Sequence, residues 1–370
     1  MHHQTTANPL LFLILSALLA GCSIGPTQQQ VEFEKPVYPK APDEPRFYWQ
    51  EMLTNNTNVE QEDEDKAMER WLTGKRRSGS GLGKPFDVSV HKGQVYVSDT
   101  VLREVLVFDR PGYSYRKIGS QGKGKLRKPF GIDLDDAGNL YVIDGANKQA
   151  FMYDPDGAFI KTIGTEDMFD RPTGIAVTDD GSRLFIVDTA GVSSTNHRVR
   201  VFDVASGDHL FDIGSRGQKD GEFNLPKNAE IGSDGLLYVN DSANFRVQIF
   251  NPDDGSFIRS VGSIGRQTGN FARPKGIAVG KDGNLYVADS AFGNFQIFNP
   301  EGQLLLFVGG RGGSGGPGQF MLPAGLDVDE DGRVYMVDQF FSKIAVFRPA
   351  AVGEDDGYFK VLRESIKREE

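Results

Sequence analysis

Acidic side chains stand at one repeated position in three of six similar segments of this chain. In the run Gly-Ile-x-Val and its variants, the third residue is Asp133, Glu230 and Asp327 in the second, fourth and sixth segments, and Ser or Ala in the others. Alternate segments around an axis would place these carboxylates in a threefold array, and carboxylate oxygens suit a hard cation such as Ca²⁺. Each acid could instead accept hydrogen bonds from a neighbouring backbone. No resident cofactor is therefore expected, and a Ca²⁺ site at these acids is the alternative.

Basic side chains gather beside the proline that begins the first strand of each segment. These cations are Lys84, Lys128, Arg171, Lys227, Arg273 and Lys275. The chain has a formal net charge of −10, so composition alone does not account for them. Cations around an opening attract an anionic partner, which could be a carboxylated small molecule, a polyanionic glycan or an acidic protein surface. The alternative is a solvated rim that aids solubility.

An aromatic pair interrupts the polar turn of the sixth segment. Phe340 and Phe341 follow Gln339 where the repeat favours a Ser/Thr-x-Asn turn. Aromatic side chains on a loop beside an opening are typical interface anchors. The alternative is that they pack under a neighbouring loop.

One aspartate marks each segment at the end of a Tyr-Val-x-Asp phrase or a near variant. These anchors are Asp99, Asp144, Asp188, Asp241, Asp289 and Asp338, at spacings of 45, 44, 53, 48 and 49 residues. A carboxylate at a strand end commonly accepts backbone N–H bonds from the following turn. Because the aspartate recurs in every segment, we expect a structural role for it.

The fifth segment, residues 271–309, shows the elements that must position these side chains. It contains four short runs rich in β-branched and aromatic residues, each bounded by Gly, Pro, Asn or Asp. Asp282-Gly283-Asn284 between the first two runs is typical of a tight hairpin turn. A repeat of this kind with a period in the forties marks a propeller blade. The sequence therefore predicts an all-β, six-bladed β-propeller of four-stranded antiparallel blades.

The repeat resembles a known family. The phrases Pro-Lys-Gly-Ile-Ala-Val, Asp-Gly-Asn-Leu-Tyr-Val-Ala-Asp and Asn-Phe-Arg-Val-Gln-Ile-Phe resemble the NHL repeat, and the resemblance covers residues 81–348. The chain as a whole resembles the bacterial six-bladed NHL-repeat lipoproteins. That resemblance implies a fold and leaves the biochemical role open.

Residues 1–21 resemble a lipoprotein signal peptide. The apolar run Leu10–Ala20 leads into Leu-Ala-Gly-Cys, and Cys22 is the only cysteine of the chain. The resemblance implies lipidation at Cys22 and a place in the bacterial cell envelope, with Ser23 directing the protein to the outer membrane. Contact with the membrane is then expected through the lipid anchor only.

The remaining chain divides into a tether, the propeller and a tail. Residues 22–45, which contain five prolines, are predicted to form a semi-rigid tether. The propeller is expected over residues 46–350, followed by a charged C-terminal tail over 351–370.

Two features are expected at the edge of the ring. Residues 46–52 read as the outermost strand of blade six, which would close the ring, and the alternative closure uses residues 358–362. Residues 60–72 are predicted to form a short helix that docks its apolar side on the ring.

These features favour a non-enzymatic envelope lipoprotein, expected to be a monomer, whose propeller binds a partner protein or an anionic ligand. The alternative is a metal-dependent lactonase-like hydrolase, or a lyase, that uses the channel carboxylates. His91, His197 and His209 show no metal-ligand spacing and are expected at the surface. An acidic pI near 5.2 and an export signal argue against nucleic-acid binding.

Overall fold

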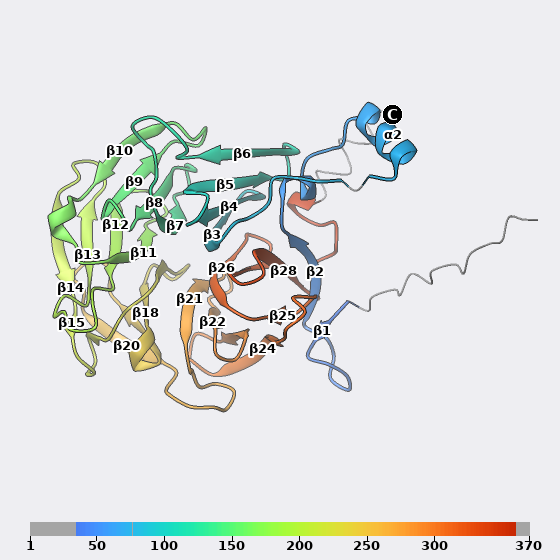
Figure 1. The fold of residues 1–370 in the computed structure, drawn as a ribbon. Coiled ribbons are helices and arrows are strands. Elements are labelled where there is room, and N and C mark those ends of the chain that lie inside the picture. The colour runs from blue at the N-terminus through green and yellow to red at the C-terminus, as the bar shows by residue number, and fades with distance from the viewer. Residues whose placement is uncertain (1–34, 76, 360–370) are drawn as a thin grey trace, which may run out of the picture. The chain divides into compact units, whose positions relative to one another are not determined.

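The computed structural model describes residues 35–75 and 77–359, and these form a six-bladed β-propeller (Figure 1). Each blade is a four-stranded antiparallel meander, so the predicted fold class is confirmed. The first strand of each blade lies innermost and contacts the first strands of the neighbouring blades. The predicted leader, Cys22 and the first part of the tether lie outside the described residues.

The first three blades follow one another in chain order. Blade one consists of β3 (Pro85–His91), β4 (Gln94–Asp99), β5 (Glu104–Asp109) and β6 (Ser114–Ile118). Blade two consists of β7 (Pro129–Leu134), β8 (Leu140–Asp144), β9 (Gln149–Tyr153) and β10 (Phe159–Ile163). Blade three consists of β11 (Pro172–Val177), β12 (Arg183–Asp188), β13 (Arg198–Asp203) and β14 (His209–Ile213).

The other three blades repeat the pattern with short additions. Blade four consists of β17 (Ala229–Ile231), β18 (Leu237–Asp241), β19 (Arg246–Phe250) and β20 (Phe257–Val261). Blade five consists of β21 (Pro274–Val279), β22 (Leu285–Asp289), β23 (Asn294–Phe298) and β24 (Leu304–Arg311). Blade six consists of β26 (Pro323–Val328), β27 (Val334–Asp338), β28 (Lys343–Pro349) and β2 (Phe47–Leu53). Short parallel pairings join β15 (Ser215–Arg216) to β16 (Glu222–Phe223), and β24 to β25 (Gln319–Phe320).

The N-terminal strand closes the ring. β2 pairs antiparallel with β28, which places Trp49 opposite Phe347, and so covers an edge that would otherwise be open. β1 (Val37–Tyr38) then pairs with β2, and the Tyr38 ring lies 5.9 Å from that of Phe347. Residues 37–38 of the predicted semi-rigid tether are thus paired with blade six, where the Tyr38 ring packs on Phe347.

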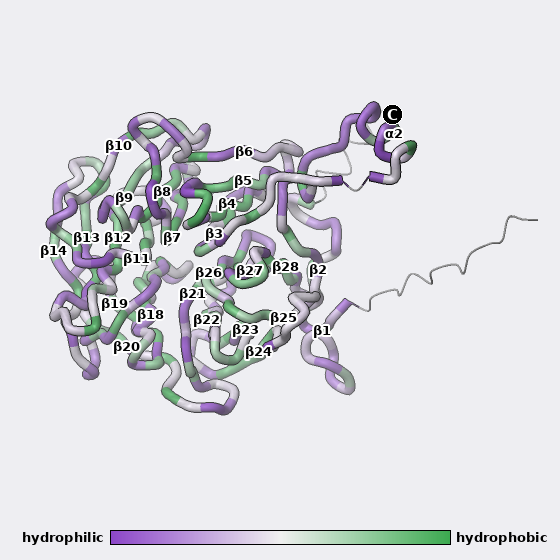
Figure 2. The backbone as a smooth tube through the Cα atoms, viewed as in Figure 1, coloured by the Kyte–Doolittle hydropathy of each residue, from purple (hydrophilic) through white to green (hydrophobic). Residues whose placement is uncertain are grey.

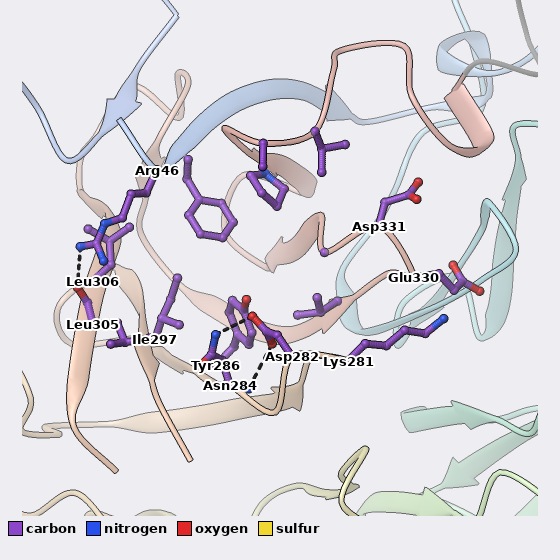
Figure 3. Close-up of a pocket in the computed structure, with 17 residues that line it drawn as sticks. Arg46, Lys281, Asp282, Asn284, Tyr286, Ile297, Leu305, Leu306, Glu330 and Asp331 are labelled. Atoms are coloured by element: carbon purple, nitrogen blue, oxygen red, sulfur yellow. Dashed lines mark hydrogen bonds between the residues drawn. The ribbon is translucent and has the colours of Figure 1, made fainter. Parts of the chain in front are cut away.

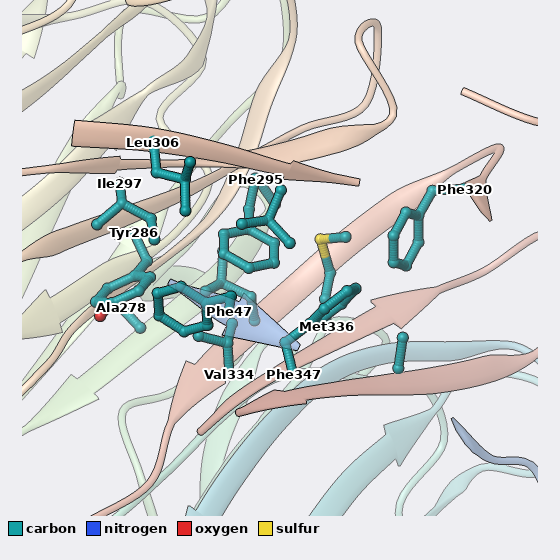
Figure 4. Packing of buried hydrophobic residues seen from close by; sticks show 14 residues of the cluster. Phe47, Ala278, Tyr286, Phe295, Ile297, Leu306, Phe320, Val334, Met336 and Phe347 are labelled. Atoms are coloured by element: carbon teal, nitrogen blue, oxygen red, sulfur yellow. The ribbon is translucent and has the colours of Figure 1, made fainter. Parts of the chain in front are cut away.

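Apolar side chains between adjacent blades form the core. In the cluster between blades five and six, the fully buried rings of Phe295 and Phe347 lie 5.4 Å apart, and Phe47 from β2 packs beside them (Figure 4). Burying each such ring contributes about 2–3 kcal/mol. Figure 2 shows the hydrophobic stretches along the strands and a largely hydrophilic α2 (Glu64–Thr73).

The predicted helix forms, but it does not dock. None of the α2 residues is buried, and Met68, Trp71 and Leu72 are 58, 79 and 69% exposed. The docking prediction is wrong, because none of the apolar side chains of α2 is buried. No helix in the described part of the chain has both the length and the apolar character needed to cross a membrane.

The beginning of the predicted tail is also part of the fold. Phe359 is buried between the guanidinium groups of Arg110 and Arg333, which lie 4.4 and 4.3 Å from its ring centroid. Arg333 also donates hydrogen bonds to the carbonyls of Gly353 and Asp356, at 3.0 Å each. Residues 351–359 are thus packed on the ring, and the rest of the predicted tail lies outside the described residues.

Candidate functional site

The anchor aspartates hold the loops that lead into each inner strand. In blade two, Asp144 accepts the backbone N–H of Lys128 at 3.2 Å and those of Ala146 and Asn147 at 2.9 and 3.0 Å. One carboxylate thereby ties the loop before β7 to the turn after β8. Asp99, Asp188, Asp241, Asp289 and Asp338 likewise accept backbone N–H bonds from the loops before their own inner strands. The anchors therefore do structural work and fix the backbone that presents the cations.

The loops converge on a cavity of about 390 Å³ at one end of the central channel. We call it the channel-mouth cavity. Its lining includes five cationic residues, namely Lys128, Arg171, Lys227, Arg273 and Lys275. Among the described residues, Asp87 at its floor is the only acid that lines it. None of the five cations forms an ion pair with any of the described acids.

Lys227 and Lys275 occupy equivalent places in blades four and five, directly after the proline. Thr173 Oγ1 donates to the Lys227 carbonyl at 3.0 Å, and the Asn240 side-chain amide donates to the Lys275 carbonyl. These contacts fix the two backbones while both side chains stay half-buried in the cavity.

Burial and the neighbouring cations lower the pKa of both ammonium groups to about 8. Arg171 and Lys275 act on Lys227 in this way, and Arg273 acts on Lys275. A bound anion would relieve this unfavourable concentration of positive charge.

Three other predicted site residues lie elsewhere. Lys84 is exposed and does not line the cavity. Phe340 is 63% exposed beside the opening, whereas Phe341 packs close to the backbone of Gly315. The two aromatic side chains contact each other with ring centroids 5.0 Å apart, and neither lines the cavity.

The predicted acids meet deeper in the channel. Asp133, Glu230 and Asp327 line a small space of about 10 Å³ together with Asp87. Asp133 accepts the N–H of Val177 from the next blade at 2.8 Å.

The other acids are held in a similar way. Asp327 accepts the N–H of Val90 at 2.6 Å, and Asp87 accepts that of Ile132 at 3.3 Å. Two of the three predicted acids, together with Asp87, thus accept backbone hydrogen bonds from a neighbouring blade. This is the alternative to a Ca²⁺ site that the sequence left open. Among the described residues, no group of three or more His, Cys, Asp or Glu side chains is arranged to hold a metal ion.

Burial raises the pKa of every one of these carboxyl groups. The pKa of Asp133 rises to about 8 and that of Asp327 to about 7, and backbone hydrogen bonds oppose the rise in both cases. The pKa values of Glu230 and Asp87 rise well above the ordinary range, first through burial and then through the neighbouring carboxylates. These shifts reduce the negative charge of the channel carboxyls and so weaken their cancellation of the positive charge of the channel-mouth cavity.

Sequence reasoning missed Asp87, Phe86 and Phe130 as lining residues. A positional signal was available, since both phenylalanines directly follow a blade's proline, as Lys227 and Lys275 do. These residues can be identified only by aligning the six segments and comparing the residue types at each position of the repeat.

The prediction of a surface His197 is also wrong. His197 is fully buried, and its Nε2 lies 3.0 Å from the Gly191 carbonyl. Its Nδ1 accepts the backbone N–H of Leu225 at 3.3 Å. In the loop before β17, Asp241 accepts the N–H of Asn224, and the imidazole accepts the next one, that of Leu225.

A second cavity, of about 460 Å³, lies between blades five and six at the opposite end of the blades (Figure 3). Most of its polar groups already have partners. Arg46 donates to the Leu305 carbonyl at 2.5 Å, and the Asn284 backbone N–H donates to Asp282 at 3.1 Å. Asp331 pairs with Arg333 at 2.8 Å. Its described lining contains two cationic residues, Arg46 and Lys281, and three acidic ones, Asp282, Glu330 and Asp331, so positive charge does not gather there as it does in the channel-mouth cavity.

Comparison with known families agrees with this architecture. Residues 80–167 match the family DUF5128, described as a six-bladed β-propeller, and residues 271–298 match the NHL repeat. The chain is a six-bladed β-propeller with NHL-type repeats.

Solved structures share this fold at low sequence identity. A protein of unknown function from Bacteroides thetaiotaomicron is 17% identical, with a TM-score of 0.57, over 82% of this chain and 76% of its own. The gluconolactonase XC5397 from Xanthomonas campestris is 16% identical, with a TM-score of 0.55, over 72% and 86%. Virginiamycin B lyase from Staphylococcus aureus is 13% identical, with a TM-score of 0.51, over 72% and 95%. Proteins this distant share an architecture with the chain, which does not fix a function.

Proposed function

We propose that this propeller is a non-enzymatic binding module that holds an anionic ligand, or an anionic group of a protein partner, in the channel-mouth cavity. The observation that supports this most is the convergence of five cations without an acidic ion-pair partner among the described residues. Unpaired charges in a partly enclosed site are unfavourable unless a ligand neutralises them. A cavity of about 390 Å³ also falls within the range of small-molecule sites.

The alternative of a lactonase-like hydrolase or a lyase has weaker support. The gluconolactonase and the lyase share only the fold with this chain. Oxygens of Asp133 and Asp327 are engaged by backbone N–H groups, so these carboxylates are poorly disposed to take up a cation or to act on a substrate. Binding is therefore the function that the geometry favours.

The proposal includes a cellular setting. The predicted signal peptide and Cys22 place the module in the bacterial cell envelope, lipid-anchored and facing its ligand as a monomer. The outer membrane is the proposed site, following Ser23. Processing at Cys22 is tested by lipid labelling, as described in the Discussion.

Titration calorimetry with succinate at low salt tests the binding proposal. Lys275→Met should weaken succinate binding by at least about tenfold, because a hydrogen bond to a charged group contributes roughly 1.5–3 kcal/mol. Lys281→Met is the matched control, since Lys281 is exposed and lies at the second cavity, at the opposite end of the blades. Equal succinate affinity in the wild type and both variants, or no binding to any of them, would contradict the proposal.

A further inference from the structure

The residue after the blade's proline faces the channel-mouth cavity in every blade. In blade order these six residues are Phe86, Phe130, Thr173, Lys227, Lys275 and Ala324, and all of them line the cavity. The repeat thus delivers six side chains to equivalent places around one axis. The chemistry of the cavity is set by which residue each blade supplies.

The six residues are segregated by chemistry. Phe86 and Phe130 belong to adjacent blades one and two, and their ring centroids lie 4.7 Å apart with 41° between the planes. Lys227 and Lys275 belong to adjacent blades four and five. In a ring of six blades, one and two lie opposite four and five. One wall of the cavity is therefore aromatic, and the opposite wall is cationic.

The remaining cations reinforce this division. Arg171 and Arg273 lie on the lysine side of the ring, close enough to lower the pKa values of Lys227 and Lys275. Lys128 instead lies over the Phe130 ring, 5.3 Å from its centroid, in a cation–π contact. The aromatic wall thus has one cation at its edge, and the other four gather opposite.

From this arrangement we infer that the ligand is an aromatic acid, with a flat ring that packs on Phe86 and Phe130 and carboxylates that reach Lys227 and Lys275. The inference rests on the proposed anion-binding function and specifies its ligand class. Aromatic rings pair in tilted or offset geometries and add binding energy beyond the area that they bury. A purely aliphatic acid would satisfy the lysines and leave the aromatic wall exposed to water.

Three dicarboxylates of equal charge separate these contributions: succinate, cyclohexylsuccinate and phenylsuccinate, each titrated calorimetrically into the full chain. We expect phenylsuccinate to bind about tenfold more tightly than succinate, with cyclohexylsuccinate in between. Phe130→Leu should remove most of the gain of phenylsuccinate, measured as the ratio of phenylsuccinate affinity to succinate affinity within the same variant. Lys275→Met should weaken all three ligands together.

A matched control is Phe340→Leu, because Phe340 is exposed at the same end of the propeller but does not line the cavity. This variant should bind all three acids like the wild type. Succinate binding without a gain for phenylsuccinate would overturn the aromatic inference and leave the anion-binding proposal standing. Equal affinity for cyclohexylsuccinate and phenylsuccinate would show an apolar site without aromatic selectivity. Binding of none of the three would overturn both proposals.

Discussion

Glu230→Gln tests whether the channel carboxyls keep their protons in the folded protein. The Glu230 side chain makes no hydrogen bond with the described residues, so glutamine replaces it without breaking a backbone contact. Burial, followed by the charges of Asp133, Asp327 and Asp87, raises the pKa of Glu230 well above 4.5. The folded protein therefore holds a proton here at pH values where the unfolded chain has released it.

The sign and size of the effect follow from linkage. Where the folded state binds more protons than the unfolded state, the free energy of unfolding falls as pH rises. The fall is about 1.4 kcal/mol per pH unit for each retained proton. Between pH 5 and pH 7, the free energy of unfolding of the wild type should therefore fall by about 3 kcal/mol relative to that of Glu230→Gln, which has no proton to retain at this position. In a folded unit of this size that amounts to roughly 4–5 °C in melting temperature.

The assay is thermal denaturation of the wild type and Glu230→Gln at half-unit steps from pH 5 to pH 7. Below pH 7 the lysines with pKa values of about 8 are still protonated and do not distort the comparison. Glu301→Gln is the control, because Glu301 is exposed and should leave the pH profile unchanged. Parallel profiles for the wild type and Glu230→Gln would refute the reasoning, since Glu230 would then ionise as freely in the channel as in the unfolded chain.

The remaining predictions concern the cavity, the buried cations and the anchor. Because the pKa values of Lys227 and Lys275 are about 8, succinate affinity should fall as pH rises from 7 to 9, which calorimetry at fixed ionic strength will show; a flat profile would mean that neither ammonium contacts the ligand. Lys343→Ala should destabilise the protein by about 2–4 kcal/mol in thermal or denaturant unfolding, because its buried ammonium donates to three backbone carbonyls that would lose their partner. Phe359→Ala should cost about 3–5 kcal/mol, and a melting temperature like that of the wild type would contradict the packing between the two guanidinium groups. Cys22→Ser should abolish incorporation of labelled fatty acid in cells, and continued labelling would exclude Cys22 as the lipidated residue.

Much of the fold could be predicted because the same strand and turn pattern occurs six times in the sequence. Strand patterns, hairpin turns and anchor aspartates such as Asp289 recur at nearly constant spacing, so an error in one blade is corrected by the others. The parts that occur once were predicted less well. The helix around Trp71 has an apolar side that would dock in a typical globular protein, but in this structure none of its residues is buried. Tyr38 and Phe359 likewise lie in segments whose composition resembles a tether and a tail, and each packs because one aromatic ring finds a specific partner.

The candidate site was predictable in part, and the reason lies in how a repeat protein divides its work. Positions that are the same in every blade, such as Asp144 and its equivalents, serve the scaffold, because each blade has the same backbone to hold. Positions that differ between blades have no role that all six blades share, although some of them also hold a neighbouring blade. The cations were found because a positive cluster stands out in an acidic chain, whereas Phe86 and Phe130 were missed because phenylalanine is common throughout it. What marks the two phenylalanines is their place in the repeat, directly after the proline, where another blade has Lys227. The position after the proline is therefore where specificity in this propeller can change without disturbing the fold, and exchanging Phe130 and Lys227 between blades should redirect ligand preference while the ring stays intact.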